Sequence, residues 1–136
     1  MKNVTFVSAL FDIDRVEGRK WDQYLKWFDV TLQLRVPKFL YITEDLQEFV
    51  DERRGDLPTK TVHITSEEIP YYHLKEPIQE ILDSDDYKNN ISDPDRIECK
   101  QAMYSVIQYS KFPWLNHATK LNPFDSDVYF WLDAGG

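Results

Sequence analysis

The first apolar segment, residues 3–11, most constrains what this chain can fold into. Alternate side chains of a strand point to opposite faces. Here both sets are apolar, with Val4, Phe6 and Leu10 on one face and Val7, Ala9 and Phe11 on the other. This pattern is typical of a strand in the middle of a parallel sheet, because helices cover both faces of such a sheet. The segment therefore predicts an α/β fold.

Strand-like and helical segments alternate along the rest of the chain. We expect strands at 38–43, 59–65 and 128–132, and helices at 21–34, 44–54 and 95–111, the last capped by Asp95. Residues 67–94 are expected to form a loop with one short helix at 77–82, and residues 113–127 to be irregular, with a turn at Asn122-Pro123. The alternation predicts parallel βαβ units.

The apolar content of the strands predicts their order. Segments 3–11 and 128–132 are the most apolar and are expected to be central, whereas 59–65 alternates apolar Val62 and Ile64 with polar residues, as an edge strand does. We predict a Rossmann-like, mostly parallel sheet of order 3-2-1-4, with helices on both faces. In that order the winding direction reverses between strands one and four, and ligands bind beyond the carboxyl ends of strands at such a switch point.

Charge and cysteine content exclude several classes of protein. The net charge of -8 argues against nucleic acid or an anionic membrane as a partner. No apolar stretch approaches the ~20 residues of a membrane-spanning helix, and no signal peptide is recognisable. The single cysteine, Cys99, excludes an internal disulfide and suits a reducing compartment. We therefore expect a cytoplasmic protein without a transmembrane segment.

Position in the predicted sheet selects one acidic site. Asp-x-Asp pairs at 12/14, 83/85, 93/95 and 125/127 are close to chance in a chain with 24 acidic residues. Asp125 and Asp127 precede the fourth strand, and Asp133 follows it, roughly 20 Å away. Only Asp133 would face the crevice, where burial of its charge would favour a divalent cation, Mn²⁺ or Mg²⁺, shared with a diphosphate. The alternative is that Asp133 caps a turn in which Gly135 takes a positive φ.

The loop after the first strand is a second candidate. It carries three basic residues beside Asp12, namely Arg15, Arg19 and Lys20. A basic cluster at the switch point of an acidic protein would contact phosphate, with Arg15 the leading candidate. The alternative is an ordinary solvated loop.

Two further positions complete the candidate site. Thr43 ends the second strand, where a nucleoside would lie, although it is equally placed to cap the following helix. Lys100 and Tyr104 are four residues apart and share one helix face that would look into the crevice. Their alternative role is a lysine stem lying over an aromatic ring.

Three segments resemble the HtrL/YibB family of bacterial sugar-transferase-like proteins. They are Phe-Asp-Ile-Asp-Arg at 11–15, Asn-Pro-Phe at 122–124 and Phe-Trp-Leu-Asp-Ala-Gly at 130–135. Residues 100–111 are also similar to the segment that precedes the metal motif in glycogenin-like glycosyltransferases. In those enzymes the first lysine of the segment contacts the nucleotide sugar, and by this match that residue is Lys100.

The resemblance implies a GT-A type fold that takes a nucleotide-diphosphate sugar as donor and a glycan as acceptor. Enzymes of the glycogenin type have two aspartates in the metal motif, whereas this chain has Asp133 and then Gly135. A second ligand would therefore come from elsewhere, or the metal is absent. In such folds the acceptor site and catalytic carboxylate follow the metal motif. We thus expect residues 1–136 to be the donor-binding part of one domain, truncated at the C-terminus and inactive alone.

Two functions follow. One is a glycosyltransferase that transfers sugar to a surface glycan; the other is a non-catalytic nucleotide-binding or structural domain that keeps the fold. The lysine helix and the basic loop favour the first, and the missing second aspartate favours the second. The open edge of the fourth strand, with Tyr129 and Trp131 exposed on it, also predicts a homo-oligomer.

Overall fold

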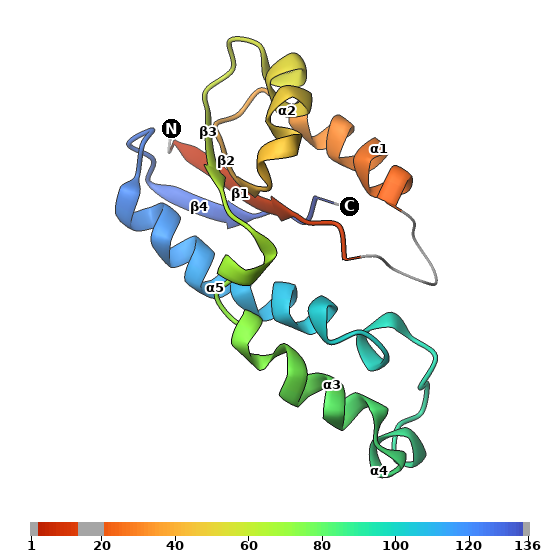
Figure 1. The fold of residues 1–136 in the computed structure, drawn as a ribbon. Helices are drawn as coiled ribbons and strands as arrows, with labels where there is room; N and C mark the ends of the chain where they lie inside the picture. Colours follow the sequence, from red (N-terminus) through yellow and green to blue (C-terminus); the bar gives the residue numbers. More distant parts are fainter. Residues whose placement is uncertain (1–2, 14–20, 135–136) are drawn as a thin grey trace.

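The chain forms one parallel four-stranded sheet. The computed structural model describes residues 3–13 and 21–134. The strands are β1 (Val4–Leu10), β2 (Lys38–Ile42), β3 (Thr59–His63) and β4 (Val128–Trp131). Their order is β3-β2-β1-β4, and every neighbouring pair is parallel (Figure 1). The predicted order and direction of the strands are confirmed.

Helices cover both faces of this sheet. Figure 1 places α1 (Trp21–Leu32) and α2 (Gln47–Arg54) on one face and α5 (Ala102–Leu121) on the other. α3 (Lys75–Asp83) packs against α5 and leads into α4 (Asp85–Asn89). The described residues also form four single 3-10 turns: Glu44–Leu46, Ser66–Glu68, Tyr72–Leu74 and Ile97–Cys99. The Rossmann-like α/β architecture is therefore confirmed, and no helix in the described ranges is long and apolar enough to span a membrane.

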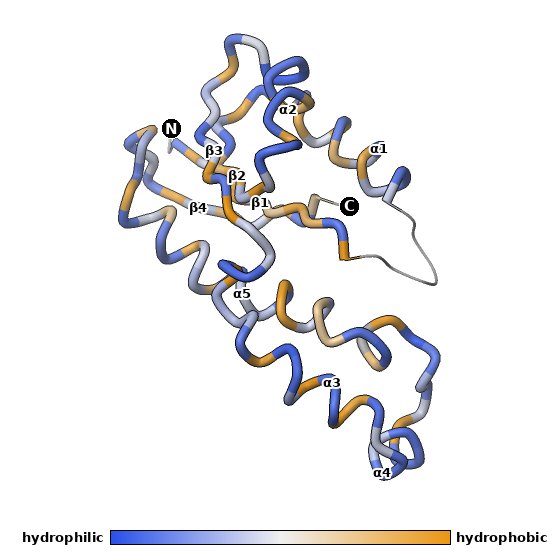
Figure 2. The backbone as a smooth tube through the Cα atoms, viewed as in Figure 1, coloured by the Kyte–Doolittle hydropathy of each residue, from blue (hydrophilic) through white to orange (hydrophobic). Residues whose placement is uncertain are grey.

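Each face of the sheet has its own hydrophobic core. Val7, Ala9 and Phe11 pack under α5, whereas Leu10 packs under α1 and α2, as the two apolar faces of the first segment predict. All five residues of β2 are buried. Figure 2 shows hydrophobic residues in the sheet and at intervals along α1, α3 and α5, while α4 is largely hydrophilic. Burial on both faces holds β1 and β2 as the inner strands.

The long helix differs from its prediction at both ends. Asp95 does not cap it, because α5 begins at Ala102 with Gln101 as N-cap, and it runs to Leu121 rather than ending before Pro113. Its buried residues recur every four positions straight through the proline: Ala102, Val106, Ser110, Trp114 and Ala118. Packing of this stripe outweighs the roughly 3 kcal/mol cost of an interior proline. Asn122 then ends the helix in the left-handed conformation, so the predicted turn is present.

The expectation that the fourth strand is central is wrong, because β4 lies at an edge of the described sheet. Its exposed aromatic residue is Phe130, at 54%. Tyr129 and Trp131 were expected to be exposed, but both are partly buried against the α5 core. Self-association through this edge stays a prediction.

The amino edge of the sheet holds two buried cations. Arg54 donates five hydrogen bonds of 2.7–2.9 Å, one to the Thr59 hydroxyl and four to the carbonyls of Leu32, Leu34, Val36 and Pro58. Lys38 is 1% exposed, and its ammonium has no hydrogen-bond partner among the described residues. Burial, with a smaller contribution from the charge of Arg54, lowers the pKa of Lys38 from 10.5 to about 8. The lysine therefore destabilises the folded state while protonated.

We predict that Lys38→Met raises the free energy of unfolding at pH 7 by up to about 3 kcal/mol. Below pH 8 both states of the wild type carry the proton and the full cost applies. Between pH 8 and 10.5 the unfolded chain binds more protons than the folded chain, so wild-type stability rises with pH. The advantage of the variant should shrink over that window in urea titrations.

The matched control is Lys60→Met, on the neighbouring strand, where the lysine is exposed. That variant should stay within about 0.5 kcal/mol of the wild type at every pH. A Lys38→Met chain that is less stable than the wild type at pH 7 would contradict the prediction.

Candidate functional site

A pocket opens at the carboxyl ends of β1 and β4. Its volume is about 180 Å³, and it is lined by residues 9–13 of the β1 end, by Asp133 and Ala134 beyond β4, and by α1 and α5. This is the point at which the winding direction of the sheet reverses. The location agrees with the rule that ligands of open α/β sheets bind beyond the carboxyl ends at a switch point.

Among the described residues, two carboxylates line this pocket, those of Asp12 and Asp133. Both side chains are exposed, so the expectation that Asp133 is buried and needs a cation to offset that burial is wrong. Asp133 instead accepts a hydrogen bond of 2.7 Å from the indole nitrogen of Trp131. One carboxylate oxygen is thus held by the protein.

One face of α5 forms a wall of the pocket. Tyr104, Ile107, Gln108 and Lys111 line it, at the three- and four-residue spacing of a single helix face. Lys111 is the only lysine or arginine among the described residues that line the pocket.

Aromatic side chains form much of the remaining lining. Trp21 and Tyr24 come from the start of α1, and Trp131 comes from the end of β4. The Trp131 ring is stacked on Trp114, with centroids 6.0 Å apart and an interplanar angle of 3°. Rings of this kind offer a flat apolar surface to a ligand while remaining anchored in the core.

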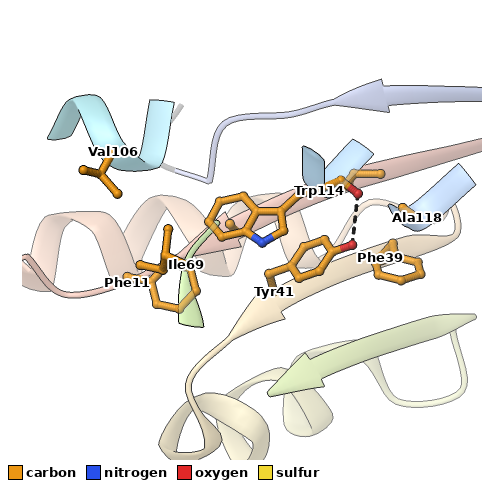
Figure 3. Packing of buried hydrophobic residues seen from close by; sticks show 9 residues of the cluster. Phe11, Phe39, Tyr41, Ile69, Val106, Trp114 and Ala118 are labelled. Carbon is orange, nitrogen blue, oxygen red and sulfur yellow. Dashed lines mark hydrogen bonds between the residues drawn. The ribbon is translucent and has the colours of Figure 1, made fainter. Parts of the chain in front are cut away.

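Trp114 connects that lining to the centre of the α5-side core. It stacks on Tyr41 at 5.2 Å and on Phe11 at 5.7 Å. Figure 3 shows the Tyr41 hydroxyl donating to the backbone carbonyl of Trp114, a bond of 3.0 Å. Burial raises the pKa of Tyr41 well above its ordinary value, so the hydroxyl stays protonated as a donor. The position of Trp131 is therefore fixed by the core itself.

The structure brings together three of the six predicted site residues. Asp12, Tyr104 and Asp133 line the same pocket. Lys100 precedes α5, forms an ion pair of 3.6 Å with Asp95 and is outside the lining. Thr43 is also outside it and makes no side-chain capping bond at the turn it precedes. Arg15 lies outside the described residues, with the rest of the basic loop.

Sequence reasoning missed several lining residues, above all Lys111, Gln108 and Trp131. The signal for the first two was present, because positions 108 and 111 follow Tyr104 by one and two helical turns. Trp131 carried no such signal, because its role depends on the stacking of a distant helix residue against the sheet.

The rejected acidic pair lies at the other end of the sheet. The Asp127 carboxylate accepts a hydrogen bond of 3.2 Å from the backbone nitrogen of Asn3, just before β1 begins. Beside it, the hydroxyls of Thr5 and Ser126 are 2.6 Å apart. These contacts close the amino end of the β1–β4 pair, so Asp133 and Asp127 belong to opposite ends of the same strand.

The described acidic residues of the pocket do not form a metal site by themselves. Within the described ranges no group of three or more His, Cys, Asp or Glu side chains could hold a metal ion. Mg²⁺ is commonly held by one or two carboxylates, with substrate phosphates and water completing the shell. Asp12 and Asp133 are therefore too few for a closed, all-protein site, and a cation held there would need ligands from a bound molecule or water.

The fold is that of a parallel α/β protein with a pocket at its switch point. The chain belongs to the HtrL_YibB family: the family model, described as a bacterial protein of unknown function, matches residues 2–136. No curated protein and no solved structure matches the chain.

Proposed function

We propose that this protein binds a nucleotide-diphosphate sugar in the pocket between β1 and β4 and transfers the sugar to a glycan acceptor. The observation that carries the proposal is the convergence of Asp12, Asp133 and Lys111 with aromatic rings at one switch point. In this proposal the two carboxylates would hold a metal ion bound to the diphosphate, and the lysine would contact the negative charge of that diphosphate. The aromatic side chains would pack against the rings of the base and the sugar.

In the proposed reaction the bond between the sugar carbon and the diphosphate oxygen breaks. An acceptor hydroxyl forms the new bond to that carbon, and its proton passes to a base. Asp12 and Asp133 would hold Mn²⁺ or Mg²⁺, which would neutralise charge on the departing diphosphate. Lys111 would add a second positive group beside it.

A second candidate function is nucleotide binding without transfer. The hydrogen bond from Trp131 to Asp133 favours this candidate, because it occupies a carboxylate oxygen that a catalytic metal ion would otherwise use. The two candidates share the donor site and differ only in turnover. Release of nucleoside diphosphate from a nucleotide sugar in the presence of glycan would separate them.

We predict that a nucleoside diphosphate binds and that Mn²⁺ or Mg²⁺ tightens the binding. Calorimetric titrations with UDP, GDP, CDP and dTDP, each with and without metal, measure both effects. At least one nucleotide should bind roughly tenfold more tightly with metal, a difference of about 1.4 kcal/mol. Eight titrations without heat of binding would refute the proposal.

We further predict that Asp133→Asn removes the effect of metal, because it deletes a ligand charge and keeps the side-chain size. Asp127→Asn is the matched control, since it makes the same change at the opposite end of the same strand. The control should retain the metal effect in the same calorimetric titrations. If instead the control loses that effect and Asp133→Asn keeps it, the site has been placed at the wrong end of the sheet.

A further inference from the structure

We propose that Lys111, and not Lys100, is the lysine that binds the diphosphate. The inference rests on the proposed function and names the residue that recognises the charged part of the ligand. It starts from the lining of the pocket, in which Lys111 is the only described basic residue. Lys100 precedes α5 and lies outside that lining.

The register of α5 is fixed on both sides of Lys111. Ser110 is fully buried, donates to the Val106 carbonyl at 2.6 Å and accepts from the Tyr71 backbone nitrogen at 3.3 Å. Trp114, one turn later, is 3% exposed and stacked in the core. A rotation of the helix would expose both, so Lys111 is held on the pocket face together with Tyr104.

The charges of the described lining favour such a residue. Apart from Lys111, the ionisable groups that the described residues bring to the lining are the carboxylates of Asp12 and Asp133 and the phenols of Tyr24 and Tyr104. Carboxylates repel a diphosphate, so a positive group beside them would favour its binding. A lysine ammonium is a suitable point charge for phosphate.

The two lysines also differ in their present contacts. Lys100 is paired with Asp95 at 3.6 Å. Among the described residues Lys111 forms no ion pair, and its ammonium lies 5.9 Å from the ring centroid of Phe112, itself 63% exposed. A contact of this kind at an exposed site is worth only about 0.5–1 kcal/mol. Rotation of the flexible lysine stem from that ring into the pocket is therefore inexpensive.

The test compares Lys111→Met with Lys100→Met. Each is titrated, in Mn²⁺ buffer, with whichever of UDP, GDP, CDP and dTDP binds the wild type best and with the corresponding unphosphorylated nucleoside. Lys111→Met should weaken nucleoside diphosphate binding by roughly 10- to 100-fold, the range of a hydrogen bond to a charged group. Its affinity for the nucleoside should be unchanged. Lys100→Met should bind both ligands as the wild type does, and Lys111→Arg should restore most of the lost affinity.

The outcomes separate this inference from the function on which it rests. If the wild type binds the diphosphate and Lys111→Met binds it equally well, Lys111 is not the phosphate ligand, while the proposed function stands. Equal losses for diphosphate and nucleoside would assign Lys111 a merely structural role and overturn the inference. If the wild type binds neither ligand, both proposals fail together. Unchanged circular dichroism melting confirms that each variant is folded.

Discussion

The pairing of β1 with a parallel neighbour on each side is the constraint on which the rest of the structure depends. Val7 lies opposite Phe39 of β2 on one side and Trp131 of β4 on the other. The chain builds the sheet outward from β1 to β2 and β3 on one side and then returns to add β4 on the other side. The helices of these two parts lie on different faces of the sheet and leave the carboxyl end of β1 uncovered. The pocket, its two carboxylates and its α5 wall all meet at that end. The strand order thus sets where the pocket lies, and this location determines which side chains line it.

A series of stacked aromatic rings connects the sheet to the pocket. Tyr41 of β2 stacks on Trp114 of α5, and Trp114 stacks on Trp131 of β4. Trp131 in turn donates its indole hydrogen to Asp133. An exposed carboxylate is ordinarily free to rotate, but here its orientation is set by a bond from a residue anchored in the core. The same contacts therefore stabilise one face of the sheet and preorganise the acidic group at its edge.

The sequence predicted the sheet better than it predicted the pocket. Strand order followed from local patterns, because the two apolar faces of β1 and the polar alternation of β3 are visible in short segments. The extent of α5 did not, because Pro113 is a strong local signal for termination and only the buried stripe from Ala102 to Ala118 overrides it. The error at the start of the helix bears on the site. The predicted helix put Lys100 and Lys111 on the same face, but α5 begins at Ala102, so Lys100 lies before the helix and outside the pocket, whereas Lys111 lines it.

Charge is distributed in opposite ways at the two ends of the sheet. The amino edge buries the cations Lys38 and Arg54, and the carboxyl edge exposes the carboxylates Asp12 and Asp133. With a net charge of -8, the protein as a whole repels an anionic ligand at a distance. That repulsion is screened within about 8 Å at physiological ionic strength, so it lowers the rate of encounter more than the strength of a contact already made. In the proposed function, affinity for a diphosphate would therefore come from short-range partners inside the pocket, and among the described residues Lys111 is the basic side chain placed to supply it.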